Sequence, residues 1–124
     1  MYKYYNPNYK MPRGTIDCSV RAVSKALNIG WDEAYLMIST RGYNLGDVMS
    51  RNLVWWDVLK DHGFHRQSLP TTCPDCYTVA DFCRNNPVGT YVLGTENHVV
   101  TVVNGNWFDT WDSGGEIVLY FFTR

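Results

Sequence analysis

The sequence predicts an α+β fold, with helices in the first two thirds of the chain and an antiparallel sheet in the last third. Apolar residues recur at helical spacing in the earlier segments, whereas β-branched and aromatic residues dominate the later segments, which Asn-Gly and Ser-Gly-Gly turns separate. The length of 124 residues suits one hydrophobic core. We therefore expect a single domain over residues 1–124, in which residues 1–14, rich in Tyr, Asn and Pro, form an extended N-terminal arm.

The first expected helix spans residues 18–28. Apolar residues recur there at intervals of three and four, Asp17 precedes the segment as an N-cap, and Gly30 ends it. A second helix is expected over residues 31–40, because its apolar residues also share one face. Residues 41–50 show no such period and are expected to form a loop.

A third helix is expected over residues 52–61, with Gly63 as the glycine that follows its end. Residues 64–69 suit a short strand, and residues 70–76 suit a loop. The segment 78–81 begins with Thr and ends with Asp, which indicates a capping box and a short fourth helix.

Only strand signals follow the fourth helix. The segments alternate or run apolar over a few residues, and polar turns interrupt them. The expected strands are 89–94, 98–103, 106–111 and 116–122.

Composition and charge exclude several classes of partner. The net charge is -1 and no long basic cluster is present, which argues against nucleic acid or an anionic membrane as a partner. No apolar stretch approaches the ~18 residues of a transmembrane helix. The first residues lack the apolar core of a signal peptide. We therefore expect a cytoplasmic protein whose four cysteines are thiols.

Cys18 and His98 are the residues that best fit a catalytic pair. Cys18 begins a predicted helix, where free backbone N–H groups and the helix dipole favour a thiolate. His98 begins a predicted strand, which is rigid enough to orient an imidazole. An imidazole next to a thiol takes its proton and later protonates the leaving group. The adjacent Asp17 opposes thiolate formation, so the thiol needs a cationic partner of this kind.

The order of these residues resembles that of papain-like cysteine peptidases. In that superfamily the nucleophile begins the central helix, the histidine begins a strand, and an Asn or Asp on the next strand orients the histidine. The segment WDSGG at 111–115 resembles the family's Asn-Ser-Trp-Gly segment, with Asp112 in the place of Asn. The segment 98–113 also resembles the His-to-Asn hairpin of Josephin-type deubiquitinases. The resemblance implies a papain-like fold and a protein or peptide substrate.

The chain as a whole resembles a group of small phage and Gram-positive bacterial proteins. The shared segments are NPN at 6–8, DCSVRA at 17–22, GTY at 89–91 and DTWDSG at 109–114. This resemblance covers nearly the full length. It implies the fold more strongly than the chemistry, because one fold serves many functions.

One feature of papain-like peptidases is missing. They usually carry a Gln a few residues before the nucleophile, as a donor to the oxyanion, whereas the only Gln of this chain is Gln67. The candidate replacements are the Cys18 backbone N–H together with one of the side chains Asn6, Asn8, Arg13 or Thr15.

The third catalytic residue depends on the turn that follows the His98 strand. If Asn104-Gly105 forms a two-residue type I′ turn, Asp109 lies on the same face as His98. If Gly105 instead ends a three-residue bulged loop, one residue of register brings Asp112 to that face. The turn rule favours Asp109. The family resemblance and the position at the strand end favour Asp112, which is the prediction adopted here: Cys18, His98 and Asp112.

The other cysteines leave three alternatives open. Cys73 and Cys76 have the spacing of half a zinc site, and Cys83 with His62 or His65 could complete it. The spacing matches no common zinc module, and a redox pair normally begins a helix next to a strand. Free thiols, with no metal and no cofactor, are therefore the favoured interpretation.

Three functions agree with the sequence. The favoured one is a papain-like thiol hydrolase, a cysteine peptidase or isopeptidase. A papain-fold protein that binds a host protein or a small ligand without catalysis is the second, and the missing Gln supports it. A small zinc protein is the third.

Overall fold

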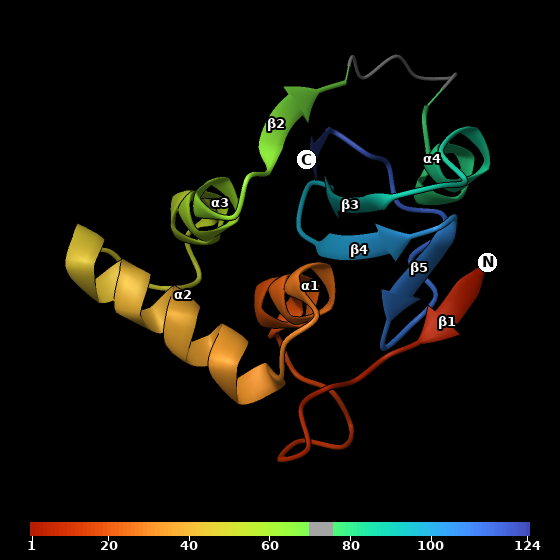
Figure 1. Ribbon diagram of the computed structural model, residues 1–124. Coiled ribbons are helices and arrows are strands. Elements are labelled where there is room, and N and C mark those ends of the chain that lie inside the picture. Colours follow the sequence, from red (N-terminus) through yellow and green to blue (C-terminus); the bar gives the residue numbers. More distant parts are fainter. Residues whose placement is uncertain (70–75) are drawn as a thin grey trace.

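The computed structural model describes residues 1–69 and 76–124. These residues form an α+β structure in which the helices lie on both faces of one mixed sheet (Figure 1). The helices are α1 (Cys18–Leu27), α2 (Trp31–Leu45), α3 (Asn52–Asp61) and α4 (Val79–Asn85). The strands are β1 (Tyr2–Tyr4), β2 (His65–Ser68), β3 (Thr90–Gly94), β4 (Val99–Val103), β5 (Asn106–Asp109) and β6 (Tyr120–Thr123).

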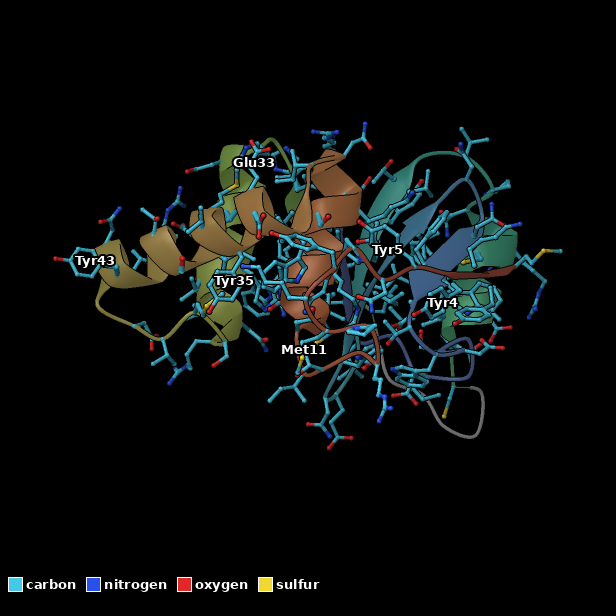
Figure 2. The ribbon with its side chains drawn as sticks, turned by 90° about the horizontal axis from the view of Figure 1, so that it is seen from below. Tyr4, Tyr5, Met11, Glu33, Tyr35 and Tyr43 are labelled. Atoms are coloured by element: carbon cyan, nitrogen blue, oxygen red, sulfur yellow. The ribbon has the colours of Figure 1, made fainter. Side chains whose placement is uncertain are left out.

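The six strands are ordered β1-β5-β4-β3-β6-β2. All neighbouring strands are antiparallel except β1 and β5, which are parallel. The expectation of a purely antiparallel sheet is therefore wrong, and so is that of an arm without a strand. Three residues of β1 are too few to show an alternating pattern, and the strand exists because β5 offers it a free edge. The backbone N–H of Tyr5, the residue that follows β1 (Figure 2), extends this contact and donates to the Asp109 carbonyl at 2.8 Å.

Two hydrophobic cores lie on opposite faces of the sheet. The larger one fills the space between α1, α2, α3 and the sheet, and the smaller one lies under α4. Neighbouring residues of a strand divide between them, since Val92 and Val99 belong to the first core whereas Leu93 and Val100 belong to the second. The central strands β3 and β4 are thus buried on both faces, which makes their ends rigid supports for side chains.

Helix α1 packs against β4, so both ends of these two elements are fixed relative to each other (Figure 1). The Thr101 hydroxyl donates to the Ala22 carbonyl at 2.7 Å and joins the strand to the middle of the helix. The helix begins at Cys18 as predicted. It ends at Leu27 because Asn28 adopts the left-handed conformation, with φ of 56°.

Helix α2 is longer than the sequence pattern indicates. Its last turns cover part of the expected loop 41–50, and Gly46 caps its end in the left-handed conformation. Tertiary contacts hold this extension. Arg41 donates to Asp57 at 2.5 Å and to Asp61 on α3, and Gly42 packs so closely that a Cβ there would lie 2.9 Å from the Asp47 carbonyl oxygen.

The remaining helices follow the predictions. Helix α3 begins and ends as expected, and Gly63 follows its end with φ of 85°. Helix α4 carries the predicted capping box, in which Thr78 and Asp81 exchange hydrogen bonds of 3.1 and 3.0 Å. No helix within residues 1–69 and 76–124 is long and apolar enough to cross a membrane.

The turn between β4 and β5 has two residues. Val103 pairs with Asn106, and both Asn104 and Gly105 have positive φ, at 49° and 78°. These values define a type I′ turn, the form that Asn-Gly favours in a hairpin. The register that follows decides which aspartate reaches His98.

Candidate active site

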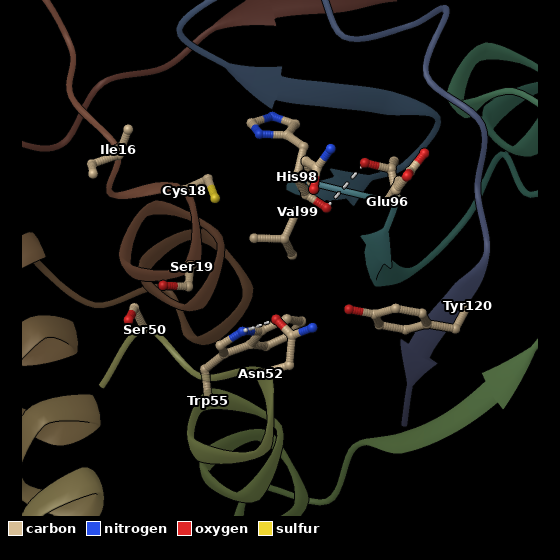
Figure 3. Close-up of a pocket in the computed structure, with 12 residues that line it drawn as sticks. Ile16, Cys18, Ser19, Ser50, Asn52, Trp55, Glu96, His98, Val99 and Tyr120 are labelled. Carbon is tan, nitrogen blue, oxygen red and sulfur yellow. Dashed lines mark hydrogen bonds between the residues drawn. The ribbon is translucent and has the colours of Figure 1, made fainter. Parts of the chain in front are cut away.

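The fold brings Cys18 and His98 together. Cys18 is the first residue of α1, and His98 immediately precedes β4. His98 lowers the pKa of the Cys18 thiol and the thiol raises the pKa of His98, so the two side chains are close enough to interact. Figure 3 shows the Cys18 sulfur pointing from the helix toward His98 and Val99. Two residues that lie 80 positions apart in the chain are thus adjacent because α1 packs along β4.

Asp109 is the carboxylate that binds His98. The His98 Nε2 atom donates to Asp109 Oδ2 at 2.6 Å, which leaves Nδ1 for Cys18. The prediction that Asp112 binds His98 is wrong. The Asp112 Oδ1 atom instead accepts from Trp107 Nε1 at 2.9 Å and from the Gly114 backbone at 3.0 Å. The two-residue turn is the physical reason for this correction. It gives the register that places Asp109 with His98.

Asp109 is held in place by more than His98. Its carboxylate accepts from Ser113 Oγ at 2.7 Å, from the Thr110 backbone at 2.8 Å and from Arg21 at 3.1 Å. Its side chain is 1% exposed, and burial on its own would raise its pKa. The hydrogen bonds from His98 and Ser113 and the charge of His98 outweigh burial and lower that pKa. Asp109 is therefore a fixed anion.

Arg21 is a buried cation that the sequence pattern did not identify. It lies one helical turn after Cys18, is 5% exposed, and donates to both Asp109 and Asp17. It also donates to the Thr15 carbonyl at 3.2 Å. Basic residues on helices are mostly solvated, so only the tertiary contact with β5 reveals this role.

Asp17 does not cap α1 as predicted. No side-chain capping hydrogen bond is present, and the carboxylate instead accepts from Arg21, from Trp31 Nε1 at 3.0 Å and from Asn8 Nδ2 at 3.2 Å. Because Arg21 neutralises this charge, Asp17 opposes a thiolate at Cys18 less than its position suggests. Charges alternate in sign from Asp17 through Arg21 and Asp109 to the imidazole.

The electrostatics favour a thiolate and an imidazolium. Burial would raise the pKa of Cys18, but the hydrogen bond and charge of His98, the Val99 backbone and the charge of Arg21 lower it overall. Burial would lower the pKa of His98, yet the hydrogen bonds to Asp109 and Cys18 raise it to about 9. Each group stabilises the charged form of the other, as in other activated thiols.

Cavities open on both sides of Cys18. One has a volume of about 310 Å³ and lies between α1, α3 and the residues before β4 (Figure 3). The other has a volume of about 380 Å³ and lies between the segment before α1 and the segment after β5. The two cavities share four lining residues, Ile16, Cys18, Asn97 and His98. The Trp111 ring packs on the imidazole with centroids 4.9 Å apart, so it limits the positions that His98 can take.

Two of the predicted oxyanion donors are engaged elsewhere. Asn8 is buried against Asp17, and Asn6 donates to the Met11 carbonyl at 3.1 Å. Arg13 and Thr15 line the second cavity, and their role as oxyanion donors stays a prediction. The first turn of α1 has no side-chain cap, so the Cys18 backbone N–H lies at a helix end that favours negative charge.

Cys76 and Cys83 line neither of the two cavities next to Cys18. Cys83 is a buried free thiol whose pKa burial raises to about 11. Cys76 is disulfide-bonded, so the expectation that it is a free thiol is wrong. Cys73 lies outside the described residues. Within the described ranges, no group of three or more His, Cys, Asp or Glu side chains could hold a metal ion.

Comparisons with known proteins add no assignment: no protein-family model, curated protein or solved structure matches the chain.

Proposed function

We propose that this protein is a thiol hydrolase of the papain-like type, acting on an amide or isopeptide bond of a protein or peptide. The observation that carries the proposal is the juxtaposition of Cys18, His98 and Asp109 at the border of two cavities, where Asp109 binds the imidazole and the imidazole lowers the pKa of the thiol. The papain-like fold belongs to the same proposal. It rests on a nucleophile that begins a helix, a histidine that precedes a strand and an acid on the next strand.

The arrangement suits covalent catalysis in two steps. The Cys18 thiolate attacks the carbonyl carbon, and the carbonyl electron pair moves to oxygen. When the carbon–nitrogen bond breaks, the imidazolium of His98 gives its proton to the leaving amine, and a thioester remains. Neutral His98 then takes a proton from water, which attacks the thioester and releases the carboxylic acid. Asp109 holds the imidazole in one orientation and stabilises its charged form throughout.

The backbone N–H of Cys18 is the oxyanion donor that the geometry favours. It lies at the uncapped first turn of α1, where the helix dipole adds to the stabilisation of negative charge. A second donor from Arg13 or Thr15 belongs to the proposal, since both line a cavity next to Cys18. With the usual Gln missing, we expect slow turnover, because losing one such donor costs roughly 10²–10³ in rate.

The test is acylation of Cys18 by p-nitrophenyl acetate at pH 7. We expect release of p-nitrophenol, a mass increase of one acetyl group at Cys18, and slow turnover of this thioester. His98→Ala should lose both phases, whereas Cys83→Ala should keep them, because Cys83 is buried away from the cavities around Cys18. Acetylation of Cys18 no faster in the folded protein than in denaturant would refute the proposal.

A second candidate is a binding protein on the same scaffold, which captures a host protein or small ligand. The commitment of Asn6 and Asn8 to other contacts favours it, because fewer donors are left for an oxyanion. Under this alternative Cys18→Ala keeps the biological effect of the protein, whereas a hydrolase loses it.

A further inference from the structure

The two cavities next to Cys18 differ in charge. The 310 Å³ cavity is here called the Glu96 cavity, and Cys18, Trp55, Glu96, His98 and Tyr120 are among the residues that line it. Of the described residues that line it, Glu96 is the only carboxylate, and none is Lys or Arg. The cavity on the other side of the thiol is lined by Arg13 and Arg21 and by no carboxylate among the described residues.

Glu96 has no structural role among the described residues. It is exposed on the turn before His98, and no hydrogen bond or ion pair involves its carboxylate within residues 1–69 and 76–124. By contrast, the buried carboxylates Asp17 and Asp109 are each bound by Arg21. No Lys or Arg lines this cavity, and the imidazolium of His98, which also lines it, is already paired with Asp109, so the Glu96 carboxylate is available to a ligand that carries a cation.

The walls of the Glu96 cavity also suit a cation. The Trp55 and Tyr120 rings form one side, and they stack on each other with centroids 6.5 Å apart. Tyr120 is held against Gly94, where an added Cβ would lie 2.0 Å from the ring. Aromatic faces attract Lys and Arg side chains. The same aromatic group already binds one guanidinium, because Arg66 lies 4.8 Å from the Tyr120 centroid, although Arg66 does not line the cavity.

Resting on the proposed hydrolase function, we propose that the Glu96 cavity binds a cationic side chain of the substrate, Lys or Arg. The carboxylate and the thiolate of Cys18 supply negative charge at the two ends of the cavity, and the aromatic wall supplies the contact for the aliphatic stem. Because Arg13 lies on the other side of Cys18, a cationic side chain is disfavoured there. The substrate class is therefore a peptide with a basic residue next to the cleaved bond, on the side of this cavity.

The test uses dipeptide chloromethyl ketones, whose chloromethyl carbon alkylates the Cys18 sulfur with loss of chloride. One residue of the probe is Gly and the other is Arg or its neutral isostere citrulline, at either position. Mass spectrometry measures the rate of Cys18 alkylation. At the position that reaches the cavity, we expect the Arg probe to react about tenfold faster than the citrulline probe, and the difference to shrink as salt is added.

The control variants separate Glu96 from general electrostatics. In Glu96→Gln the Arg-to-citrulline ratio should fall to within twofold of one, whereas in Arg13→Gln it should stay or rise. An equal ratio in the unmodified protein, or a ratio that Glu96→Gln leaves unchanged, overturns this inference. Iodoacetamide labelling of Cys18 in the same samples then tells the two proposals apart: labelling leaves the hydrolase proposal standing, and its absence overturns both.

Discussion

Asp109 and Asp112 give the sharpest test of the site, because the two side chains are three positions apart and only one binds His98. Asp109 contributes to raising the pKa of His98 from 6.5 to about 9, which corresponds to about 3 kcal/mol in favour of the imidazolium. The His98 side chain is 10% exposed, so solvent screens this stabilisation little. Cys18 supplies the rest of it.

Replacing Asp109 with Asn removes the charge and keeps the size of the side chain. If Asp109 contributes about 2 of those 3 kcal/mol, the thiolate–imidazolium pair becomes about thirtyfold less populated relative to thiol and imidazole. We expect the rate of Cys18 alkylation by iodoacetamide at pH 7 to fall at least about tenfold. The pH at half-maximal rate should rise toward the ordinary value of 9.0 for the thiol.

The matched control is Asp112→Asn, which alters the contacts with Trp107 and Gly114 and leaves Asp109 in place. Its alkylation rate should stay within about twofold of the unmodified protein. Circular dichroism of each variant shows whether it is folded. Should Asp109→Asn not fold, Ser113→Ala removes one hydrogen bond to the same carboxylate and should raise the half-maximal pH by a smaller amount. Equal effects of Asp109→Asn and Asp112→Asn would refute the reasoning.

Three further predictions concern stability. Arg21→Met leaves two buried carboxylates without their shared cation and should lower the free energy of unfolding by about 3–5 kcal/mol, whereas Arg84→Met, on an exposed ion pair, should leave the urea midpoint nearly unchanged. Gly94→Ala places a methyl group 2.0 Å from a buried tyrosine ring and should cost about 2 kcal/mol, whereas Gly115→Ala has no neighbour within 4 Å; equal urea midpoints would contradict this. The stabilisation that Cys18 provides over Cys18→Ala should reach its full value between pH ~6.5 and ~9, where folding only moves a proton from thiol to imidazole. It should decrease below that range, where the unfolded chain binds one more proton, and stay nearly level above it, because the unfolded thiol and the folded imidazolium both lose a proton near pH 9; urea titrations from pH 5 to 10 measure this.

Much of the fold followed from local signals. The starts of α1, α3 and α4 and the strands β3 to β5 are set by spacing, capping residues and the Asn-Gly turn, which act over a few residues. Helix α2 and strand β1 exceed the sequence expectation because distant partners stabilise them, Asp57 and Asp61 for the helix and β5 for the strand.

The sequence predicted the site in part, as it did the fold. Cys18 and His98 each begin an element, so their approach follows once α1 packs on β4. The choice between Asp109 and Asp112 depended on one residue of register, and the turn rule gave the better answer than the family resemblance. Arg21 was out of reach of the sequence, because its partner Asp109 lies 88 positions away.

The central claim is that Cys18 is an activated thiolate, and selective alkylation tests it most directly. The folded protein is treated with iodoacetamide at pH 7, and the rates at Cys18 and at Cys83 are measured by mass spectrometry. Because the pKa of Cys18 is lowered and that of buried Cys83 is raised to about 11, we predict labelling at Cys18 at least about a hundredfold faster. Equal rates at the two thiols, or no labelling of Cys18 until the protein unfolds, would contradict the account.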